Sequence, residues 1–324
     1  MVTPSSSAFG EAGFDRIKAA RKATVKVGSL SSDELAAYLA GGALSIQIGP
    51  FLLAIRSSLP SLASALHRLY EDNSCALQPP FADFHVALEL VSGLHRWLRP
   101  QVHFTLDGQG PFQSLPRGQA LPLLEWRLNW CVANHGHSFL VLHAASLERG
   151  GRAVILPGPP GSGKSTLCAA LVLAGWRLLS DELTLVSLKD GALAALARPI
   201  SLKNASIALI QARAPAAVFS TSIQDTQKGT LALMKAPRDS IVRMHEPAQP
   251  AWVVFPRYRP EAQTQLKERP KEETTIELAR NAFNYSLYGR RGFELLIELV
   301  EAVACYSFVY GSLDEAVDQV SALP

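Results

Sequence analysis

The sequence predicts an α/β protein with a mixed β-sheet in its core. Residues 152–156 form an apolar run typical of a buried strand, and a glycine-rich loop joins this run to a predicted helix at 166–174. Two further apolar stretches, 183–188 and 192–196, are separated only by Lys189-Asp190-Gly191. Only antiparallel strands can be joined by so short a connection. An all-parallel core would instead alternate strands with helices of about ten or more residues, so the sheet is predicted to be mixed.

The N-terminal third of the chain predicts a smaller α+β domain. Short apolar or alternating stretches predict strands, and Ser31 or Ser32 can cap a helix that Gly41-Gly42 ends. Gly49-Pro50 joins two of the strands, and Pro60 suits the first turn of a second helix. The expected elements are, in order, strand 24–27, a helix through 33–39, strands 44–48 and 51–55, a helix from 60 to about 70, and strands 84–91 and 102–106.

A helix at residues 121–132 is predicted to connect this domain to a larger one. Its Trp126 and Trp130 are four residues apart, a spacing that favours core packing over a base-stacking surface. The other elements expected in the larger domain are strands 139–142, 144–147 and 177–179, a proline-rich and loop-dominated stretch at 246–270, and helices 292–304 and 313–320.

The composition indicates a folded protein of two domains. Of the 324 residues, 48% are hydrophobic and 18% are charged, which supplies enough apolar material for a core and excludes a disordered chain. The formal net charge of +3 is small for this length and no run of Lys or Arg stands out, so we expect no nucleic-acid partner. We expect a frayed N-terminus at residues 1–23, the smaller α+β domain at 24–135 and the larger domain at 136–324.

The cysteines and the apolar runs bear on the cellular compartment. Cys75, Cys131, Cys168 and Cys305 are widely spaced and form no C-x-x-C pair, so neither a disulfide framework nor a zinc site is predicted. We expect buried thiols in a reducing compartment. Residues 1–21 contain no apolar segment typical of a signal peptide, and no run of about eighteen apolar residues occurs. The sequence therefore predicts a cytoplasmic protein without membrane insertion.

The glycine-rich loop matches the phosphate-binding motif G-x-x-x-x-G-K-[ST] at every constrained position. Its residues are Gly158, Pro159, Pro160, Gly161, Ser162, Gly163, Lys164, Ser165 and Thr166. Glycines let successive backbone N–H groups converge on phosphates, and Lys164 adds a charge that can reach the terminal phosphates. Ser165 is then placed to bind Mg²⁺, and the N-terminus of the following helix adds partial positive charge. The motif predicts a nucleoside triphosphate site with ATP and Mg²⁺ as the expected ligands.

Two acidic residues, Asp181 and Glu182, follow the next predicted strand. A carboxylate there can face the phosphates across the loop, so one acid can hold Mg²⁺ and the other can accept the proton of an attacking hydroxyl. His143 lies where two predicted strands meet; it is a candidate for proton transfer, and a structural histidine fits the sequence equally well. Lys203 and Lys228 are candidate contacts for phosphate or for the acceptor, and solvated surface lysines are the alternative.

His143, the loop at 158–166 and Ser180-Asp181-Glu182 resemble the C-terminal domain of HPr serine kinase/phosphorylase. The fold of that family is similar to phosphoenolpyruvate carboxykinase, with a mixed sheet around the phosphate-binding loop. A closer resemblance, to the HPr-kinase-related kinase A group associated with exosortase-type loci, spans nearly the whole chain. The segments that look most like this group are 198–204, 226–230 and 283–310.

The resemblance implies that Asp181 and Glu182 share the general-base and magnesium roles, with His143 nearby, and it raises Lys228 above an ordinary surface lysine. The sequence departs from the family at Glu182, where the family has aspartate, and at Pro160, where the HPr kinase loop commonly has serine. It also lacks the E-I-R-G-x-G-like signature that the bifunctional enzymes carry after the paired acids. Phosphorylase activity and HPr as the acceptor therefore stay open.

Together these residues predict an ATP- and magnesium-dependent kinase that transfers the terminal phosphoryl group to a hydroxyl, with Ser or Thr of a protein or peptide as the favoured acceptor. One alternative is a nucleotide-regulated binding protein without significant phosphoryl transfer, and another is a kinase of a free small molecule. No arginine finger can be assigned, so hydrolysis is neither supported nor excluded. Because HPr kinases form hexamers, the resemblance also implies a homo-oligomer.

Overall fold

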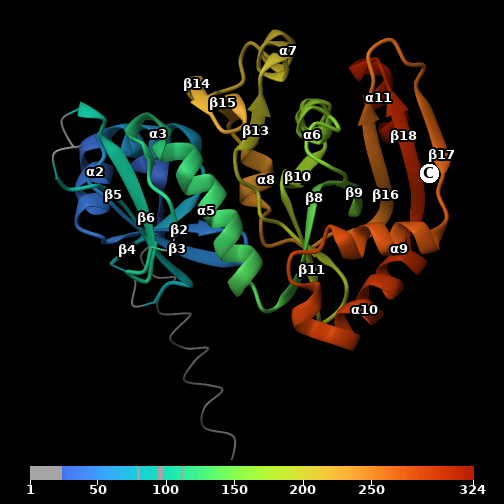
Figure 1. Ribbon diagram of the computed structural model, residues 1–324, viewed down its shortest axis with the longest axis horizontal. Coiled ribbons are helices and arrows are strands. Elements are labelled where there is room, and N and C mark those ends of the chain that lie inside the picture. Colours follow the sequence, from blue (N-terminus) through green and yellow to red (C-terminus); the bar gives the residue numbers. More distant parts are fainter. Residues whose placement is uncertain (1–23, 79–80, 94–97, 111) are drawn as a thin grey trace, which may run out of the picture. The chain divides into compact units, whose positions relative to one another are not determined.

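The computed structural model describes residues 24–78, 81–93, 98–110 and 112–324, and the expected frayed N-terminus at 1–23 lies outside them (Figure 1). Contacts divide the chain into two compact units. The first contains the described residues from 24 to 117 except for the short segments 48–50 and 68–70, and the second contains these two segments and residues 118–324. The boundary between the units thus falls earlier than the expected residue 135. The helix that follows this boundary belongs to the second unit, because its polar contacts are with residues of that unit.

Within its described residues, the first unit contains a seven-stranded sheet and two α-helices. Its elements are β1 (Thr24–Lys26), the 3₁₀ turn η2 (Val27–Ser29), α2 (Ser32–Ala40), β2 (Leu44–Ile48), β3 (Phe51–Ser57), α3 (Pro60–Leu69), β4 (Ser74–Leu77), β5 (Phe84–Leu90), β6 (Gln101–Leu106) and β7 (Leu115–Pro116). The strand order is β1-β4-β2-β3-β5-β6-β7. Strands β3 and β5 are parallel, whereas β1–β4, β2–β4, β5–β6 and β6–β7 are antiparallel. The predicted α+β organisation of this unit is confirmed.

Helix α2 begins with a capping box that identifies Ser31 as the cap. The Oγ atom of Ser31 accepts a hydrogen bond from the Glu34 N–H at 3.2 Å, and the Ser31 N–H donates to the Glu34 carboxylate at 2.8 Å. Strands β4 and β7 were not predicted, because each is too short to show a period-two pattern.

The second unit contains the rest of the elements. They are η3 (Arg117–Gln119), α5 (Ala120–His135), β8 (Phe139–Arg149), β9 (Arg152–Pro157), α6 (Lys164–Leu173), β10 (Arg177–Ser180), β11 (Leu183–Ser187), β12 (Leu193–Ala194), β13 (Ile200–Lys203), α7 (Ala205–Arg213), β14 (Ile223–Thr226), β15 (Gly229–Met234), α8 (Arg238–Val242), β16 (Gln249–Tyr258), β17 (Gln265–Glu268), α9 (Lys271–Arg280), α10 (Tyr285–Glu301), β18 (Ala304–Tyr310) and α11 (Leu313–Ser321).

The main sheet of the second unit has eight strands and is mixed, as predicted. Its order is β12-β11-β8-β9-β16-β18-β17, and β10 also pairs with β8. Strand β9 is antiparallel to β8 and parallel to β16, which is in turn parallel to β18. The predicted hairpin is present, since β11 and β12 are antiparallel neighbours. Strands β13, β15 and β14 form a separate antiparallel sheet.

Helices cover both faces of the main sheet. One apolar cluster joins the sheet to α6, α7, α8 and α11, and a second joins its other face to α9 and α10. Alternate residues of β8 contribute to different clusters, with Leu140 and Leu142 facing α10 and with Ala145 and Leu147 facing α6. Strand β8, which precedes β9, is therefore buried on both faces.

Three expectations for the second unit were wrong. The two strands expected at 139–142 and 144–147 are one continuous strand, β8, so His143 lies inside a strand. The stretch 246–270 is not loop-dominated, because β16 and β17 lie in it. Its Pro250 lies where the register with β9 shifts, and its Pro256 lies beyond the last residue paired with β9. The helix expected at 292–304 is α10, which begins at Tyr285, ends at Glu301 and is followed by β18, a strand that was not predicted.

Two further expectations concern the cysteines and membrane insertion. Cys75, Cys131, Cys168 and Cys305 are all free and buried, as predicted. Within the part of the chain that the structure describes, none of the helices has the length and apolar character needed to span a bilayer.

A buried ion pair joins β8 to β10. Glu148 and Arg177 are 2% and 3% exposed, and the Arg177 Nε donates to the Glu148 carboxylate. The Arg177 guanidinium also donates to the backbone oxygens of Arg243 at 2.9 Å and Glu246 at 3.0 Å. Burial alone would raise the pKa of Glu148, but the N–H of Gly151 and the charges of Arg177 and Arg243 outweigh burial and lower it.

Replacing Glu148 with Gln should lower the free energy of unfolding by about 3–5 kcal/mol near neutral pH, because Arg177 would be left buried without its counter-charge. The lowered pKa means that the stabilisation is present above pH 4.5 and is lost as the pH falls below that value. Urea unfolding should be measured near neutral pH and below pH 4.5. The difference in stability between Glu148→Gln and the wild type should be smaller at the acid pH. The control is Glu246→Gln, whose carboxylate is 56% exposed beside Arg243 and should cost less than about 1 kcal/mol. Equal costs for the two variants would contradict the prediction.

Candidate functional site

The glycine-rich loop that is predicted to bind phosphate connects β9 to α6 at the carboxyl end of β9. Helix α6 begins at Lys164, two residues earlier than predicted, and Gly163 is its N-cap with a φ of +95°. A Cβ atom on Gly163 would lie only 2.3 Å from the Tyr310 hydroxyl and 3.1 Å from the Tyr258 Cβ. The Tyr310 hydroxyl donates to the Gly163 carbonyl at 3.2 Å. Glycine is therefore required at this position both by the backbone angle and by the close approach of β18.

The Lys164 side chain is folded back over the loop. It is 8% exposed, and its Nζ donates to the carbonyl of Gly158 and, at 3.2 Å, to the carbonyl of Pro159. Burial lowers the pKa of Lys164, whereas the charges of Asp181 and Glu182 oppose this effect. The ammonium group is thus bonded to two backbone carbonyls and lies near two carboxylates.

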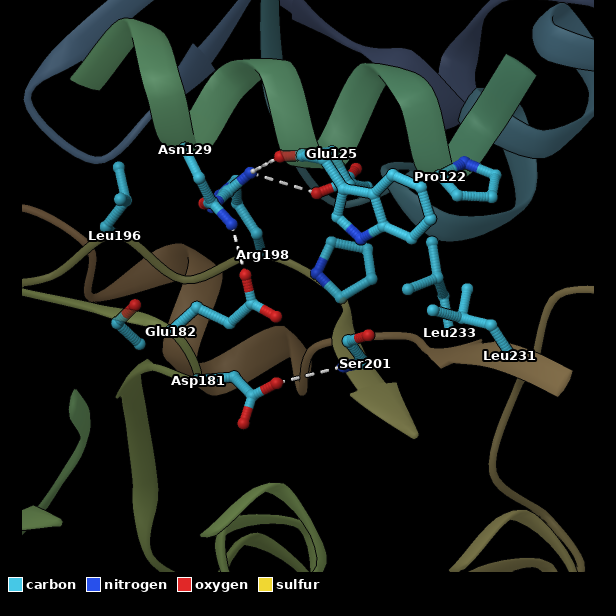
Figure 2. A pocket seen from close by; sticks show the side chains of 13 residues that line it. Pro122, Glu125, Asn129, Asp181, Glu182, Leu196, Arg198, Ser201, Leu231 and Leu233 are labelled. Carbon is cyan, nitrogen blue, oxygen red and sulfur yellow. Dashed lines mark hydrogen bonds and ion pairs between the residues drawn. The ribbon is translucent and has the colours of Figure 1, made fainter. Parts of the chain in front are cut away.

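Asp181 follows β10 and is buried, with one carboxylate oxygen unmatched. Its Oδ2 accepts from the Ser201 N–H at 3.0 Å (Figure 2). Its Oδ1 is buried without a well-formed hydrogen bond in the described chain, although the Ser165 hydroxyl is close enough to stabilise the carboxylate. Burial and the charge of Glu182 raise the pKa of Asp181 to about 6, against the effects of the Ser201 N–H and Ser165. Oxygen ligands of this kind suit Mg²⁺, which binds one or two carboxylates together with substrate phosphates.

Glu182 is held by a chain of polar side chains from α5. The Asn129 Nδ2 donates to the Glu182 carboxylate, and the Asn129 Oδ1 accepts from Arg198 (Figure 2). Arg198 also donates to the Glu125 carboxylate at 3.0 Å and to its backbone carbonyl at 3.3 Å. Burial raises the pKa of Glu125, and the charge of Arg198 opposes this. Because Arg198 fixes the orientation of the Asn129 amide, the Asn129 NH₂ group points to Glu182.

These residues enclose a small pocket between α5 and the sheet formed by β13 and β15. One side is apolar and the other carries the two acids, and the full lining is Pro122, Glu125, Trp126, Asn129, Ser180, Asp181, Glu182, Leu196, Arg198, Pro199, Ser201, Leu231 and Leu233 (Figure 2). The cavity measures about 20 Å³, which is the space for a water molecule or a hydroxyl group.

His143 lies on the face of β8 that is turned toward α6, and it is close to the charged groups of the site. Burial is the main cause that lowers its pKa, and the charges of Lys164, Lys203 and Lys228 act in the same direction while Glu182 opposes them. The His143 ring lies 5.6 Å from the Phe283 ring. The structure thus brings His143 together with Lys164 and Glu182, as predicted.

The two candidate lysines come from the small antiparallel sheet. Lys203 ends β13, and Lys228 lies in the turn between β14 and β15. The Lys228 Nζ is 5.1 Å from the centroid of the Trp126 ring, and burial lowers its pKa while Glu182 raises it. Trp126 therefore forms a wall of the site, and the expectation that it packs in the core was wrong. Trp130 instead contacts the ring of His135 at 5.6 Å.

Glu125 and Asn129 were missed in the sequence, and Arg198 received no role there. A signal was available, because Arg198 interrupts an otherwise apolar run and Glu125 lies in a largely apolar helix. Buried charges of this kind need partners, but their pairing joins segments far apart in the chain.

No group of three or more His, Cys, Asp and Glu side chains suited to a metal ion occurs in the described ranges of the chain. Near the loop, Ser165 lies beside the Asp181 carboxylate, and both side chains carry oxygen atoms of the kind that bind Mg²⁺. No protein-family model matches this sequence, and no curated protein matches it.

Replacing Gly163 or Gly175 with alanine should lower the free energy of unfolding by different amounts, although the two glycines have similar backbone conformations. Gly163 and Gly175 have φ values of +95° and +92°, but a Cβ atom on Gly175 would meet no atom within 4 Å. Gly175→Ala should cost about 1–2 kcal/mol from backbone strain alone. Gly163→Ala should cost at least about 1 kcal/mol more because of the clash with Tyr310. Thermal unfolding of both variants checks this, and equal losses would show that the close approach is unimportant.

Proposed function

We propose that this protein is an ATP- and magnesium-dependent kinase that phosphorylates a hydroxyl group. The observation that carries the proposal is the unmatched buried Oδ1 of Asp181 beside Ser165, at the start of the loop helix. A buried carboxylate oxygen without a partner is costly, and a cation bound to phosphates on the loop would satisfy it. The neighbouring Glu182 supplies a second carboxylate for proton transfer.

In this proposal the loop and Lys164 bind the phosphates. Backbone N–H groups of the loop and the N-terminus of α6 face them. The Lys164 ammonium exchanges its contacts with the Gly158 and Pro159 carbonyls for contacts with the terminal phosphates. Ser165 and Asp181 would hold Mg²⁺, and the bound ion offsets charge on the phosphates.

The two acids take different roles because their surroundings differ. Asp181 uses one oxygen on the Ser201 N–H and lies beside Ser165, which suits a metal ligand. Glu182 lines the pocket, where Asn129 orients it, and this suits a general base. The acceptor oxygen forms a bond to the terminal phosphorus, the bond from that phosphorus to the ADP oxygen breaks, and the hydroxyl proton passes to Glu182.

A side-chain hydroxyl of a protein or peptide is the acceptor that we favour. The small cavity beside Glu182 has about the volume of a hydroxyl group. The resemblance to the HPr-kinase-related kinase A group supports a protein acceptor as well. Lys203 and Lys228 carry positive charge at the same place and suit the transferred phosphoryl group. A cytoplasmic location and self-association stay predictions.

Incubation with terminally labelled ATP and Mg²⁺, against proteins or peptides encoded by neighbouring genes, tests the proposal. We expect label on a Ser or Thr of one acceptor, and we expect Lys164→Ala and Asp181→Asn to abolish it. The control is Lys189→Ala, an exposed lysine in the β11–β12 turn, which should retain transfer. ATP binding without transfer, together with a partner affinity that changes with ATP, would instead favour the nucleotide-regulated binding protein.

Removing the Asn129 amide should slow phosphoryl transfer without weakening ATP binding. In Asn129→Ala, Glu182 loses the donor that orients it, and we expect kcat to fall by about tenfold to a hundredfold with little change in KM for ATP. The control is Asn134→Ala on the same helix, because Asn134 is exposed and its amide bonds only to the Trp130 carbonyl. A similar loss of kcat in both variants would contradict the positioning role.

A further inference from the structure

Tyr258 is an exposed aromatic residue held directly against the phosphate-binding loop. It is the last residue of β16 and is 48% exposed. Its backbone N–H donates to the Ser162 carbonyl at 2.9 Å, and its Cβ lies 3.1 Å from the position that a Cβ on Gly163 would take. About half of this side chain is therefore open to solvent at the edge of the loop.

The strand pattern turns the Tyr258 ring toward the N-terminus of α6. Trp252 and Val254 of β16 pack in the cluster that contains α6, and Tyr258 shares their face because strand side chains alternate. Tyr258 is paired in register with Tyr310, and the two ring centroids are 5.6 Å apart. Tyr310 in turn bonds to the Gly163 carbonyl. The Tyr258 ring is therefore supported from one side and open on the other.

The acids and Tyr258 lie on opposite sides of the loop strand. Strand β9 lies between β8 and β16. Strand β8 carries His143 and pairs with β10, whereas β16 carries Tyr258. Asp181 and Glu182 follow β10, so the terminal phosphate of a triphosphate belongs on the β8 side. The nucleoside end must then leave the loop on the β16 side.

We propose that the exposed face of Tyr258 stacks on the base of the bound nucleotide. This inference rests on the proposed triphosphate site of the loop and adds the subsite for its nucleoside end. Stacking uses the π-face that every base has, so the contact strengthens nucleotide binding without selecting one base. The subsite accounts for an aromatic residue that phosphate binding and proton transfer do not use.

Calorimetric titration of the full chain with ATP and with inorganic triphosphate tests the inference. Tyr258→Leu keeps an apolar side chain but loses the ring, and it should weaken ATP binding by about tenfold or more while leaving inorganic triphosphate binding unchanged. Tyr258→Phe keeps the ring and should bind ATP like the wild type. The matched control is Phe293→Leu, which removes an exposed ring of α10 and should change neither affinity.

Unchanged ATP affinity in Tyr258→Leu would overturn the inference. An equal loss of affinity for ATP and for inorganic triphosphate would also overturn it, because that result would indicate damage to the loop. If the wild type bound neither ligand, the triphosphate site and the stacking subsite would both fail. If ATP binding showed the expected ring dependence but no acceptor were phosphorylated, the kinase proposal would fail and the stacking subsite would stand.

Discussion

Charge buried at one edge of the main sheet is the constraint on which the second unit depends. Lys164 and Asp181 are 8% and 6% exposed, and burial disfavours the charged form of both. Removing a charged group from water costs several kcal/mol unless partners compensate. The loop carbonyls, the Ser201 N–H and the opposite charges of the two groups supply this compensation. These contacts connect the turn after β10 and the start of β13 to the glycine-rich loop.

The direction of each strand decides which residues reach this edge. Because β8 is antiparallel to β9, its chain passes the loop in mid-strand, and His143 lies beside the loop although neither end of β8 does. Because β16 and β18 are parallel to β9, their carboxyl ends lie at the loop, and they end in Tyr258 and Tyr310. A mixed sheet therefore surrounds one loop with acids on one side and aromatic rings on the other, which an all-parallel order would not produce from these segments.

Local patterns in the sequence were sufficient for the loop, its helix and the hairpin at β11–β12, because each depends on residues close together in the chain. They failed at β16, where Pro250 and Pro256 suggested a loop. Prolines are tolerated there because one lies at a register shift and the other lies beyond the pairing with β9. They also failed for Asn129 and Trp126, whose roles depend on Glu182 and Lys228, and no spacing rule connects residues so far apart. The loop and its acids were thus predictable, whereas the side chains that orient those acids were not.

Two buried acids in the same unit, Glu148 and Asp181, differ in how their carboxylates are bonded. Glu148 has both oxygens bonded, one to the Gly151 N–H and the other to Arg177, and its pKa is lowered despite burial. Asp181 has one oxygen bonded and one unmatched, and its pKa is raised to about 6. The exposed fractions of the two side chains are similar, so the difference lies in their partners. Glu148 is bonded at both oxygens and faces the charges of Arg177 and Arg243, whereas Asp181 lies beside the like charge of Glu182 and keeps one oxygen unmatched. A fully bonded carboxylate can only hold the fold together, whereas Asp181 retains an oxygen that can coordinate a cation beside Ser165. This is the physical reason why the function that we propose is centred on Asp181 rather than on Glu148.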